Sequence, residues 1–265
     1  MNTEEKTRAV KEIIASGGSM LVAFSGGVDS TLLAVLAKEV LGNNTLCVLL
    51  DSPLVPRDAV EQAHTVAHEL GLKLETIAVP QIEHKEFRKN PANRCYYCKK
   101  ISAAYLRQRA EEQGLAIVAD GMNISDMAEY RPGLAASTEE GIIHPFIESG
   151  ITKKEIREIA REYGLSVWQK PSAACLSSRI PYGEEITREK LRMIEEAEAF
   201  LAGQGFGQVR VRLHGTIARI EVHKEEMEKI LDMQPAVVRK LRSIGFSYVT
   251  LDLEGYRSGS MDEVL

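Results

Sequence analysis

The sequence predicts an α/β protein, a doubly wound parallel sheet joined to a second, smaller α+β domain. Up to about residue 170, short apolar runs of strand character alternate with segments of helical periodicity. That order is typical of a parallel sheet with helices on both faces. Beyond about residue 186 a helix, a hairpin, two short helices and a last strand follow instead. We therefore expect an α/β domain over 1–170, a linker over 171–185 and a small α+β domain over 186–265.

The elements of the α/β domain follow from apolar spacing and from capping residues. A capping box, Thr152 to Glu155, opens the last helix, and Asn93 is a candidate N-cap for the helix before it. His144-Pro145-Phe146 is interpreted as a turn. The expected strands are 20–24, 45–50, 72–79 and 115–119, and the expected helices are 4–15, 28–41, 57–70, 95–113 and 152–164. In the small domain we expect a helix at 187–202, a hairpin at 207–222 and a strand at 248–253.

Composition narrows the class of protein. The chain has 265 residues, net charge −5 and 44% hydrophobic residues, which suits a globular protein. An acidic surface argues against a nucleic-acid partner, because neutralising phosphates needs basic side chains. The first residues mix charges without the apolar core of a signal peptide, and no apolar run approaches the ~18–20 residues that span a bilayer. We expect a cytoplasmic homo-oligomer with no membrane contact.

The stretch from Met20 to Leu33 carries the first functional signal. A strand, a glycine turn and a helix N-terminus in that order form an anion site, since the first helical N–H groups carry roughly +0.5 charge. The pattern S-G-G-V-D-S lacks the lysine of a Walker loop. Two serines add hydroxyl donors, and an aspartate could hold a Mg²⁺ ion shared with phosphates. The expected ligands of pyrophosphate and Mg²⁺ are Ser25, Gly26, Gly27, Asp29 and Ser30.

Further nucleotide contacts are expected at the carboxyl ends of neighbouring strands, where ligands bind in open α/β sheets. Asp51 and Ser52 end the second strand and are predicted to contact adenosine. Gly121 follows the fourth strand and is expected to let the adenine ring approach the backbone.

The four cysteines suggest a second kind of chemistry. Cys47 lies inside a predicted strand and is expected to be a buried thiol. Cys95 and Cys98 lie one turn apart at a helix N-terminus, a setting that lowers a thiol pKa. C-x-x-C alone fits zinc, redox or iron–sulfur roles, and no second C-x-x-C completes a zinc site. With Cys175 the pair could hold a 4Fe–4S cluster with one open iron; a plain redox pair or unrelated thiols are the alternatives.

The predicted hairpin has an unusual pair of arginines. Gly215-Thr216 as a two-residue turn places Arg212 opposite Arg219 and Arg210 opposite Glu221. Like charges directly opposite each other destabilise a hairpin, so a bound anion would explain the pair. Replacing Arg212 is then expected to stabilise the free hairpin slightly. The alternative is a solvated face on which the long side chains splay apart.

Three motifs together resemble one enzyme family. The S-G-G-V-D-S loop resembles that of the ATP pyrophosphatases, and with C-L-S-S-R-I-P-Y-G and V-R-V-R-L-H-G…A-R-I-E-V the chain resembles LarE-type sulfur transferases. The resemblance implies an ATP- and Mg²⁺-dependent enzyme that adenylylates a carboxylate of pyridinium-3,5-biscarboxylic acid mononucleotide. Sulfur then forms a thiocarboxylate for the nickel-pincer nucleotide. It implies Cys175 as the catalytic residue and Arg179, Arg210 and Arg212 as substrate ligands.

Members of this family differ in their sulfur source. Single-cysteine forms surrender the sulfur of the residue that matches Cys175, whereas forms with three cysteines resemble cluster-dependent tRNA thiolases. Cys95 and Cys98 favour a 4Fe–4S cluster held with Cys175. Two other classes stay open, a tRNA-thiolating enzyme and a nucleotide sensor that binds ATP without releasing pyrophosphate.

Overall fold

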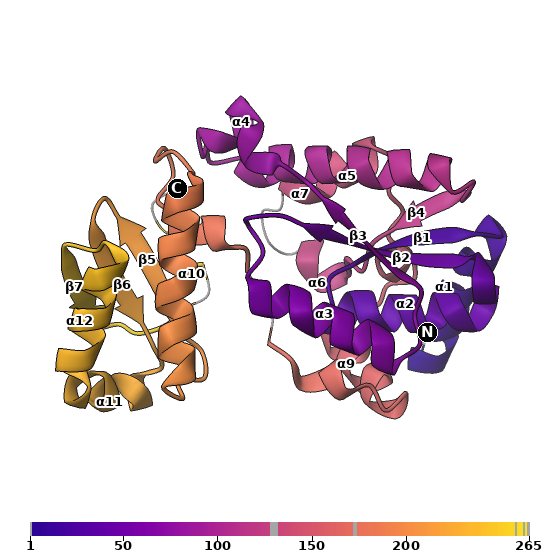
Figure 1. Ribbon diagram of the computed structural model, residues 1–265. Helices are drawn as coiled ribbons and strands as arrows, with labels where there is room; N and C mark the ends of the chain where they lie inside the picture. Colours follow the sequence, from indigo (N-terminus) through magenta and orange to yellow (C-terminus); the bar gives the residue numbers. More distant parts are fainter. Residues whose placement is uncertain (1, 128–131, 172–173, 258, 262, 264–265) are drawn as a thin grey trace. The chain divides into compact units, whose positions relative to one another are not determined.

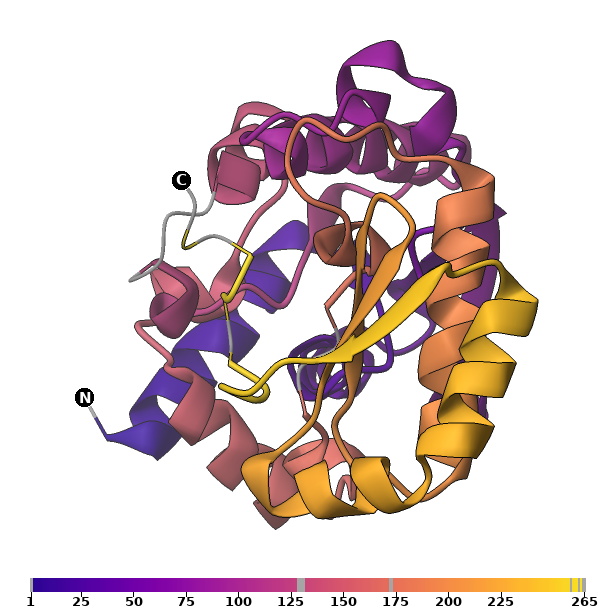
Figure 2. The same ribbon diagram turned by 90° about the vertical axis from the view of Figure 1, so that its left-hand side faces the viewer.

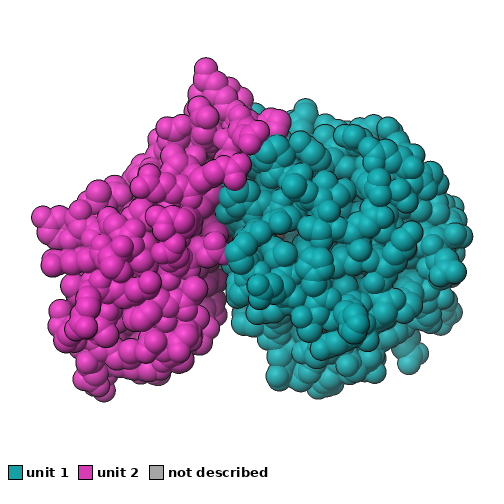
Figure 3. Space-filling view, viewed as in Figure 1, with its two compact units in different colours: residues 1–81, 93–173 teal, residues 82–92, 174–265 magenta. Residues whose placement is uncertain are grey.

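The structure is a computed structural model that describes residues 2–127, 132–171, 174–257, 259–261 and 263 (Figure 1). The chain forms two compact units (Figure 3). Unit 1 comprises residues 1–81 and 93–173, and unit 2 comprises residues 82–92 and 174–265. Residues 82–92 fall inside the expected domain 1–170 but belong to unit 2. The expected domain bounds of 1–170, 171–185 and 186–265 stay a prediction.

Unit 1 is built on a four-stranded parallel sheet in the order β3-β2-β1-β4, which confirms the predicted α/β class. Alternate residues of β1 enter two separate cores. Met20, Val22 and Phe24 pack with the apolar faces of α1, α2 and α9, whereas Leu21 packs with α5. Helices therefore cover both faces of the sheet, as a doubly wound fold requires. The strands are β1 (Met20–Phe24), β2 (Thr45–Asp51), β3 (Leu74–Ala78) and β4 (Ile117–Ala119).

The long helices of unit 1 lie where the apolar spacing placed them. The predicted capping box is present at α9, with Thr152 and Glu155 bonded reciprocally. Asn93 is the N-cap residue of α5, although its side chain makes no capping bond. The helices are α1 (Thr3–Gly17), α2 (Val28–Leu41), α3 (Arg57–Glu69), α5 (Arg94–Glu112), α6 (Ile124–Met127), α7 (Pro132–Glu139), α8 (Pro145–Glu148) and α9 (Lys153–Glu162), with 3-10 turns η1 (Gly42–Asn44) and η3 (Ser166–Gln169).

One local prediction in unit 1 is wrong. Pro145 and Phe146, interpreted as part of a turn, begin the short helix α8 with His144 at its N-cap. A proline fits the first turn of a helix because its missing N–H has no intrahelical partner there. Helices α6 and α7 were not predicted from the sequence.

Unit 2 is a small α+β fold. The hairpin β5–β6 pairs in the predicted register, and β7 adds to β6 in parallel, giving the order β5-β6-β7. Helices α10 and α12 pack on each other, α10 on β5 and α12 on β7 (Figure 2). The elements are α4 (Lys85–Arg88), η4 (Leu176–Arg179), α10 (Arg188–Gly203), β5 (Arg210–His214), β6 (Ile217–Glu221), η5 (Lys224–Glu226), α11 (Met227–Asp232), α12 (Gln234–Ile244) and β7 (Tyr248–Leu251), while η2 (Gln81–Glu83) joins the two units.

A buried asparagine attaches residues 82–92 to the rest of unit 2. The Asn90 side chain donates to the carbonyls of Ile180 and Pro181, and the backbone carbonyl of Asn90 accepts from the Gly183 N–H at 2.8 Å. Its φ of 53° is the left-handed conformation that asparagine tolerates better than most residues. None of the helices within the described ranges is both long and apolar enough to cross a membrane.

Candidate active site

The β1–α2 junction of unit 1 has the geometry of an anion site. Gly26 has φ +66°, and a Cβ there would lie 2.7 Å from the Cα of Ala63, so only glycine fits. Gly27 is the N-cap of α2 and offers no capping side chain to the helix. The Ser30 hydroxyl accepts from the Ser25 N–H at 3.1 Å and lies 3.1 Å from the Ser25 hydroxyl. The turn therefore presents helix N–H groups and hydroxyls to one region.

Gly121 lies against this same turn. A Cβ on Gly121 would lie 2.8 Å from the carbonyl carbon of Asp29 and 2.9 Å from the backbone nitrogen of Ser30. The absent side chain thus lets the loop after β4 reach the first turn of α2. The role of Gly121 in accommodating adenine stays a prediction. Its close packing on the Asp29 backbone is observed in the structure.

The Asp29 carboxylate is held by two residues that the sequence analysis did not single out. Lys153, the first residue of α9, forms an ion pair with Asp29 Oδ2, and Asn123 Nδ2 donates to Oδ1 at 3.4 Å. The side chains of Asp29 and Lys153 are 26% and 27% exposed. A carboxylate that solvent still reaches offers the oxygen ligands that Mg²⁺ prefers.

A second lysine also contacts the turn. Lys170 Nζ donates to the Gly26 carbonyl at 3.2 Å. Burial lowers the pKa of Lys170, and the charge of Asp58 offsets only part of that effect. A half-buried ammonium group at this turn adds positive charge to a region that already has the geometry of an anion site.

The predicted adenosine contacts lie at the end of β2. Asp51 Oδ1 accepts from Arg57 Nη1 at 2.6 Å, and the buried Ser52 hydroxyl accepts from the Leu54 N–H at 3.1 Å. Both side chains thus organise the β2–α3 connection at the carboxyl edge of the sheet. Their contact with adenosine stays a prediction.

Asp120 and His144 form a buried pair at the end of β4. His144 Nδ1 lies 2.7 Å from Asp120 Oδ1, and Lys99 Nζ lies 3.7 Å from Oδ2. Burial alone would raise the pKa of Asp120, but Lys99 and His144 outweigh it and hold the pKa below its ordinary value. Asp120 Oδ1 also accepts from the Met122 N–H, which fixes the start of the loop that carries Gly121.

The cysteines divide between the units. Cys47 is buried as expected, and burial raises the pKa of its thiol to about 12. Cys95 and Cys98 lie in the first turns of α5 in unit 1, and Cys175 precedes η4 in unit 2. Cys175 Sγ lies 3.0 Å from the Ser177 hydroxyl. Among the described residues, no three Cys, His, Asp or Glu side chains are gathered to hold a metal ion.

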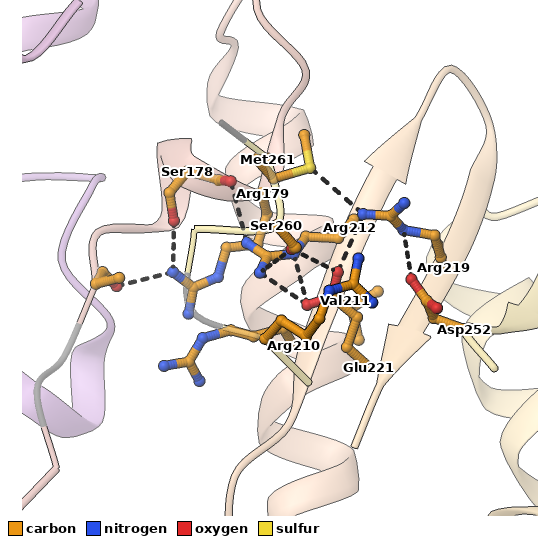
Figure 4. Close-up of polar contacts among 12 residues, drawn as sticks. Ser178, Arg179, Arg210, Val211, Arg212, Arg219, Glu221, Asp252, Ser260 and Met261 are labelled. Carbon is orange, nitrogen blue, oxygen red and sulfur yellow. Dashed lines mark hydrogen bonds and ion pairs between the residues drawn. The ribbon is translucent and has the colours of Figure 1, made fainter. Parts of the chain in front are cut away.

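The arginine pair of the hairpin is neutralised by the protein itself. The Glu221 carboxylate is fully buried and accepts from Arg212 Nη2 at 2.7 Å, from Arg219 Nη2 at 3.0 Å and from the Ser260 hydroxyl at 3.0 Å (Figure 4). The anion that the opposed arginines require is therefore Glu221. The expectation that replacing Arg212 stabilises the hairpin is wrong, because the replacement would leave Glu221 buried with one guanidinium fewer.

The charge of Arg179 is also paired with a carboxylate of unit 2. It is 2% exposed and forms a two-point ion pair with Glu198, with Nε and Nη2 each donating at 2.9 Å. Its Nη1 donates to the carbonyls of Ala174 and Cys175. Arg179 thus fixes the backbone of the Cys175 motif against α10.

Arg210 differs from its two neighbours. Its Nη1 donates to the Val209 carbonyl at 2.8 Å, and its guanidinium lies 5.5 Å from the Tyr256 ring centre. Figure 4 shows this group pointing away from Glu221. Burial lowers the pKa of Arg210, and the charge of Arg179 lowers it further. Of the three arginines, Arg210 is the one whose guanidinium gains most from an added anion.

Sequence comparison relates this chain to a protein family and to several known proteins. The family model for NAD synthase matches residues 4–122. The chain is 40% identical to an uncharacterized Synechocystis protein, covering 99% of this chain and 98% of the relative. It is 36% identical to an uncharacterized protein of Methanocaldococcus jannaschii, covering 90% and 91%.

A third relative has an assigned activity. The chain is 39% identical to the pyridinium-3,5-bisthiocarboxylic acid mononucleotide synthase of Lactiplantibacillus plantarum, covering 92% of this chain and 89% of that enzyme. The likeness spans both units, and the glycine turn before α2 lies within the NAD synthase match. This protein belongs to the LarE-like family of PP-loop ATP pyrophosphatases and is an ATP-dependent enzyme.

Proposed function

We propose that this enzyme activates a carboxylate of pyridinium-3,5-biscarboxylic acid mononucleotide with ATP and converts it to a thiocarboxylate. The observation that carries the proposal is the S-G-G-V-D-S turn at the N-terminus of α2, in a chain 39% identical to a synthase named for the bisthiocarboxylic product. A helix N-terminus with glycines at the turn suits binding of the departing pyrophosphate.

The proposed chemistry has two steps. A substrate carboxylate oxygen attacks the α-phosphorus of ATP, the bond from that phosphorus to the bridging oxygen breaks, and pyrophosphate leaves with the electron pair. A sulfur nucleophile then attacks the acyl carbon, and AMP leaves with the former carboxylate oxygen. The α2 turn binds the leaving group through its N–H groups and the Ser25 and Ser30 hydroxyls. Asp29 would hold Mg²⁺, which neutralises phosphate charge, while Asp51, Ser52 and Gly121 would surround adenosine.

Substrate recognition is assigned to the arginines of unit 2. We propose that Arg210 contacts a phosphate or carboxylate of the pyridinium nucleotide directly, supported by its position away from Glu221. Arg179, paired with Glu198, and Arg212, paired with Glu221, hold the Cys175 motif and the hairpin in place around it. Charge-assisted hydrogen bonds of this kind contribute on the order of 1.5–3 kcal/mol each.

For the sulfur step we propose Cys175 together with Cys95 and Cys98 as ligands of a 4Fe–4S cluster, which would supply a bound sulfide. The support is the C-x-x-C pair on the first turns of α5. Cys95 and Cys98 belong to unit 1 and Cys175 to unit 2, so both units would have to contribute ligands to such a cluster. The alternative is sacrifice of the sulfur of Cys175, whose Sγ lies 3.0 Å from the Ser177 hydroxyl.

The fate of Cys175 separates the two sulfur sources. Mass spectrometry of the protein after anaerobic reaction with sulfide supplied should show an intact chain, and activity should require both Cys95 and Cys98. Conversion of Cys175 to dehydroalanine, with full single-turnover activity in the Cys95→Ala/Cys98→Ala variant, would establish the sacrificial route.

The activation step is tested by pyrophosphate release. Release should require the pyridinium nucleotide and cease in Asp29→Ala, with the circular dichroism spectrum unchanged. Release that proceeds equally with tRNA in place of the pyridinium nucleotide would assign the enzyme to tRNA thiolation. ATP binding without release under any of these conditions would make it a nucleotide sensor.

A further inference from the structure

Lys153 occupies a position that its own helix disfavours. It is the first residue of α9, where the helix dipole is positive, and its ammonium group contacts Asp29 at the positive end of α2. The ammonium group thus lies near two helix N-termini, and in the described structure a single carboxylate, Asp29, forms an ion pair with it. A region with this surplus of positive charge favours a polyanion.

The stability of α9 does not explain Lys153. The helix begins with its own capping box, in which Glu155 bonds Thr152, and the charge of Glu155 is paired with Lys6 at 2.7 Å. The next residue, Lys154, shows what an ordinary lysine does here: its side chain is 87% exposed, with Glu158 3.9 Å away. The Lys153 side chain instead contacts Asp29 in the turn before α2.

The contact with Asp29 also has a consequence for metal binding. Asp29 is the carboxylate of the S-G-G-V-D-S turn, and one of its oxygens is already taken by the Lys153 ammonium. A divalent cation at Asp29 must compete with that positive charge. Once displaced, the flexible four-carbon side chain of lysine needs another acceptor within its reach.

We propose that Lys153 is a built-in counter-ion that neutralises Asp29 before nucleotide binds and then transfers to the departing pyrophosphate. Lys170, on the Gly26 carbonyl, provides a second positive charge at the same turn. Lys153 thereby makes metal binding depend on nucleotide, since Mg²⁺ displaces the lysine readily only when phosphates are present to receive it. This inference deepens the proposed function at its activation step.

Two binding measurements on Lys153→Met test the proposal, and the two affinities are expected to change in opposite directions. The nucleotide-free protein should bind Mn²⁺, used as the probe ion in electron paramagnetic resonance, several-fold more tightly, because the competing ammonium group is gone. Binding of pyrophosphate, measured by calorimetry with a chelator present, should weaken by about tenfold or more, as expected for one lost charge-assisted contact.

The neighbouring residue gives the matched control. Lys154→Met removes the same charge one position away and should leave both affinities unchanged. Lys153→Arg keeps the charge and should retain pyrophosphate binding near the parent level, which guards against a folding defect. Neither measurement uses the pyridinium nucleotide, so their outcome is separate from that of the proposed function. The proposal would be overturned if Lys153→Met bound both Mn²⁺ and pyrophosphate more weakly, or if its affinity for either one were unchanged.

Discussion

Removing the buried Glu221 carboxylate is expected to destabilise unit 2 strongly. In Glu221→Ala, Arg212 and Arg219 stay directly opposite each other on β5 and β6 without the anion that both now contact. Arg212 is 6% exposed at its side chain, so water cannot replace the lost partner. The Ser260 hydroxyl loses its acceptor as well.

The magnitude follows from the burial of this ion cluster. Removing one member of a buried ion pair typically costs about 3–5 kcal/mol, because the remaining charge is left uncompensated. Arg219 is 30% exposed and can turn toward solvent, so the larger part of the loss comes from Arg212. We expect a decrease of about 3–4 kcal/mol in the free energy of unfolding of unit 2.

Urea denaturation followed by circular dichroism measures the loss, and hydrogen exchange of the hairpin amides locates it. Trp168 lies in unit 1 and is the single tryptophan of the chain, so its fluorescence reports the other unit in the same samples. Glu228→Gln, an exposed carboxylate on α11, is the matched control and should change stability by a few tenths of a kcal/mol at most. A loss below about 1 kcal/mol in Glu221→Ala would contradict the assignment of Glu221 as the anion of the arginine pair.

Three further predictions follow from the sites. Gly121→Ala should weaken pyrophosphate binding, because its Cβ would lie 2.8 Å from the Asp29 carbonyl carbon, whereas Gly203→Ala, with open space around it, should not; calorimetry compares the two. Arg210→Ala should weaken binding of the pyridinium nucleotide by more than about tenfold with little change in stability, and unchanged affinity would place the substrate elsewhere. The pKa of Asp120 is lower in the folded protein than its ordinary 3.8, so its contribution to stability is present above that value and is lost as the pH falls through the folded value. Asp120→Asn should therefore make the free energy of unfolding less steep with pH on the acid side, and an unchanged slope would refute this.

Local sequence patterns were enough to predict the α/β fold and the glycine turn before α2. The bounds of α2, Val28–Leu41, follow from a glycine turn, a helical apolar repeat and Gly42 after the last turn. The β5–β6 register follows from a two-residue turn and an alternating apolar face, and it places Arg212 opposite Arg219 as predicted. These features depend on residues close together in the chain.

Contacts between distant segments were not predictable in the same way. Nothing near Asp29 indicates that Lys153 will reach it, and nothing near Asn90 indicates that residues 82–92 will join unit 2. The strand register places Arg210 directly opposite Glu221. Long side chains also reach diagonal neighbours on a sheet, and the Arg212 side chain reaches Glu221 in this way. That diagonal contact supplies the anion that was instead assigned to the substrate.

The transfer of oxygen from substrate to AMP tests the central claim most directly. If a carboxylate of the pyridinium nucleotide attacks the α-phosphorus and sulfur later displaces AMP, a carboxylate labelled with heavy oxygen must leave one labelled atom in AMP. Mass spectrometry of the products should therefore find the label in AMP, none in pyrophosphate, and sulfur in place of one oxygen in the pyridinium product. Label in pyrophosphate, or unlabelled AMP formed alongside thiocarboxylate, would contradict activation by adenylylation.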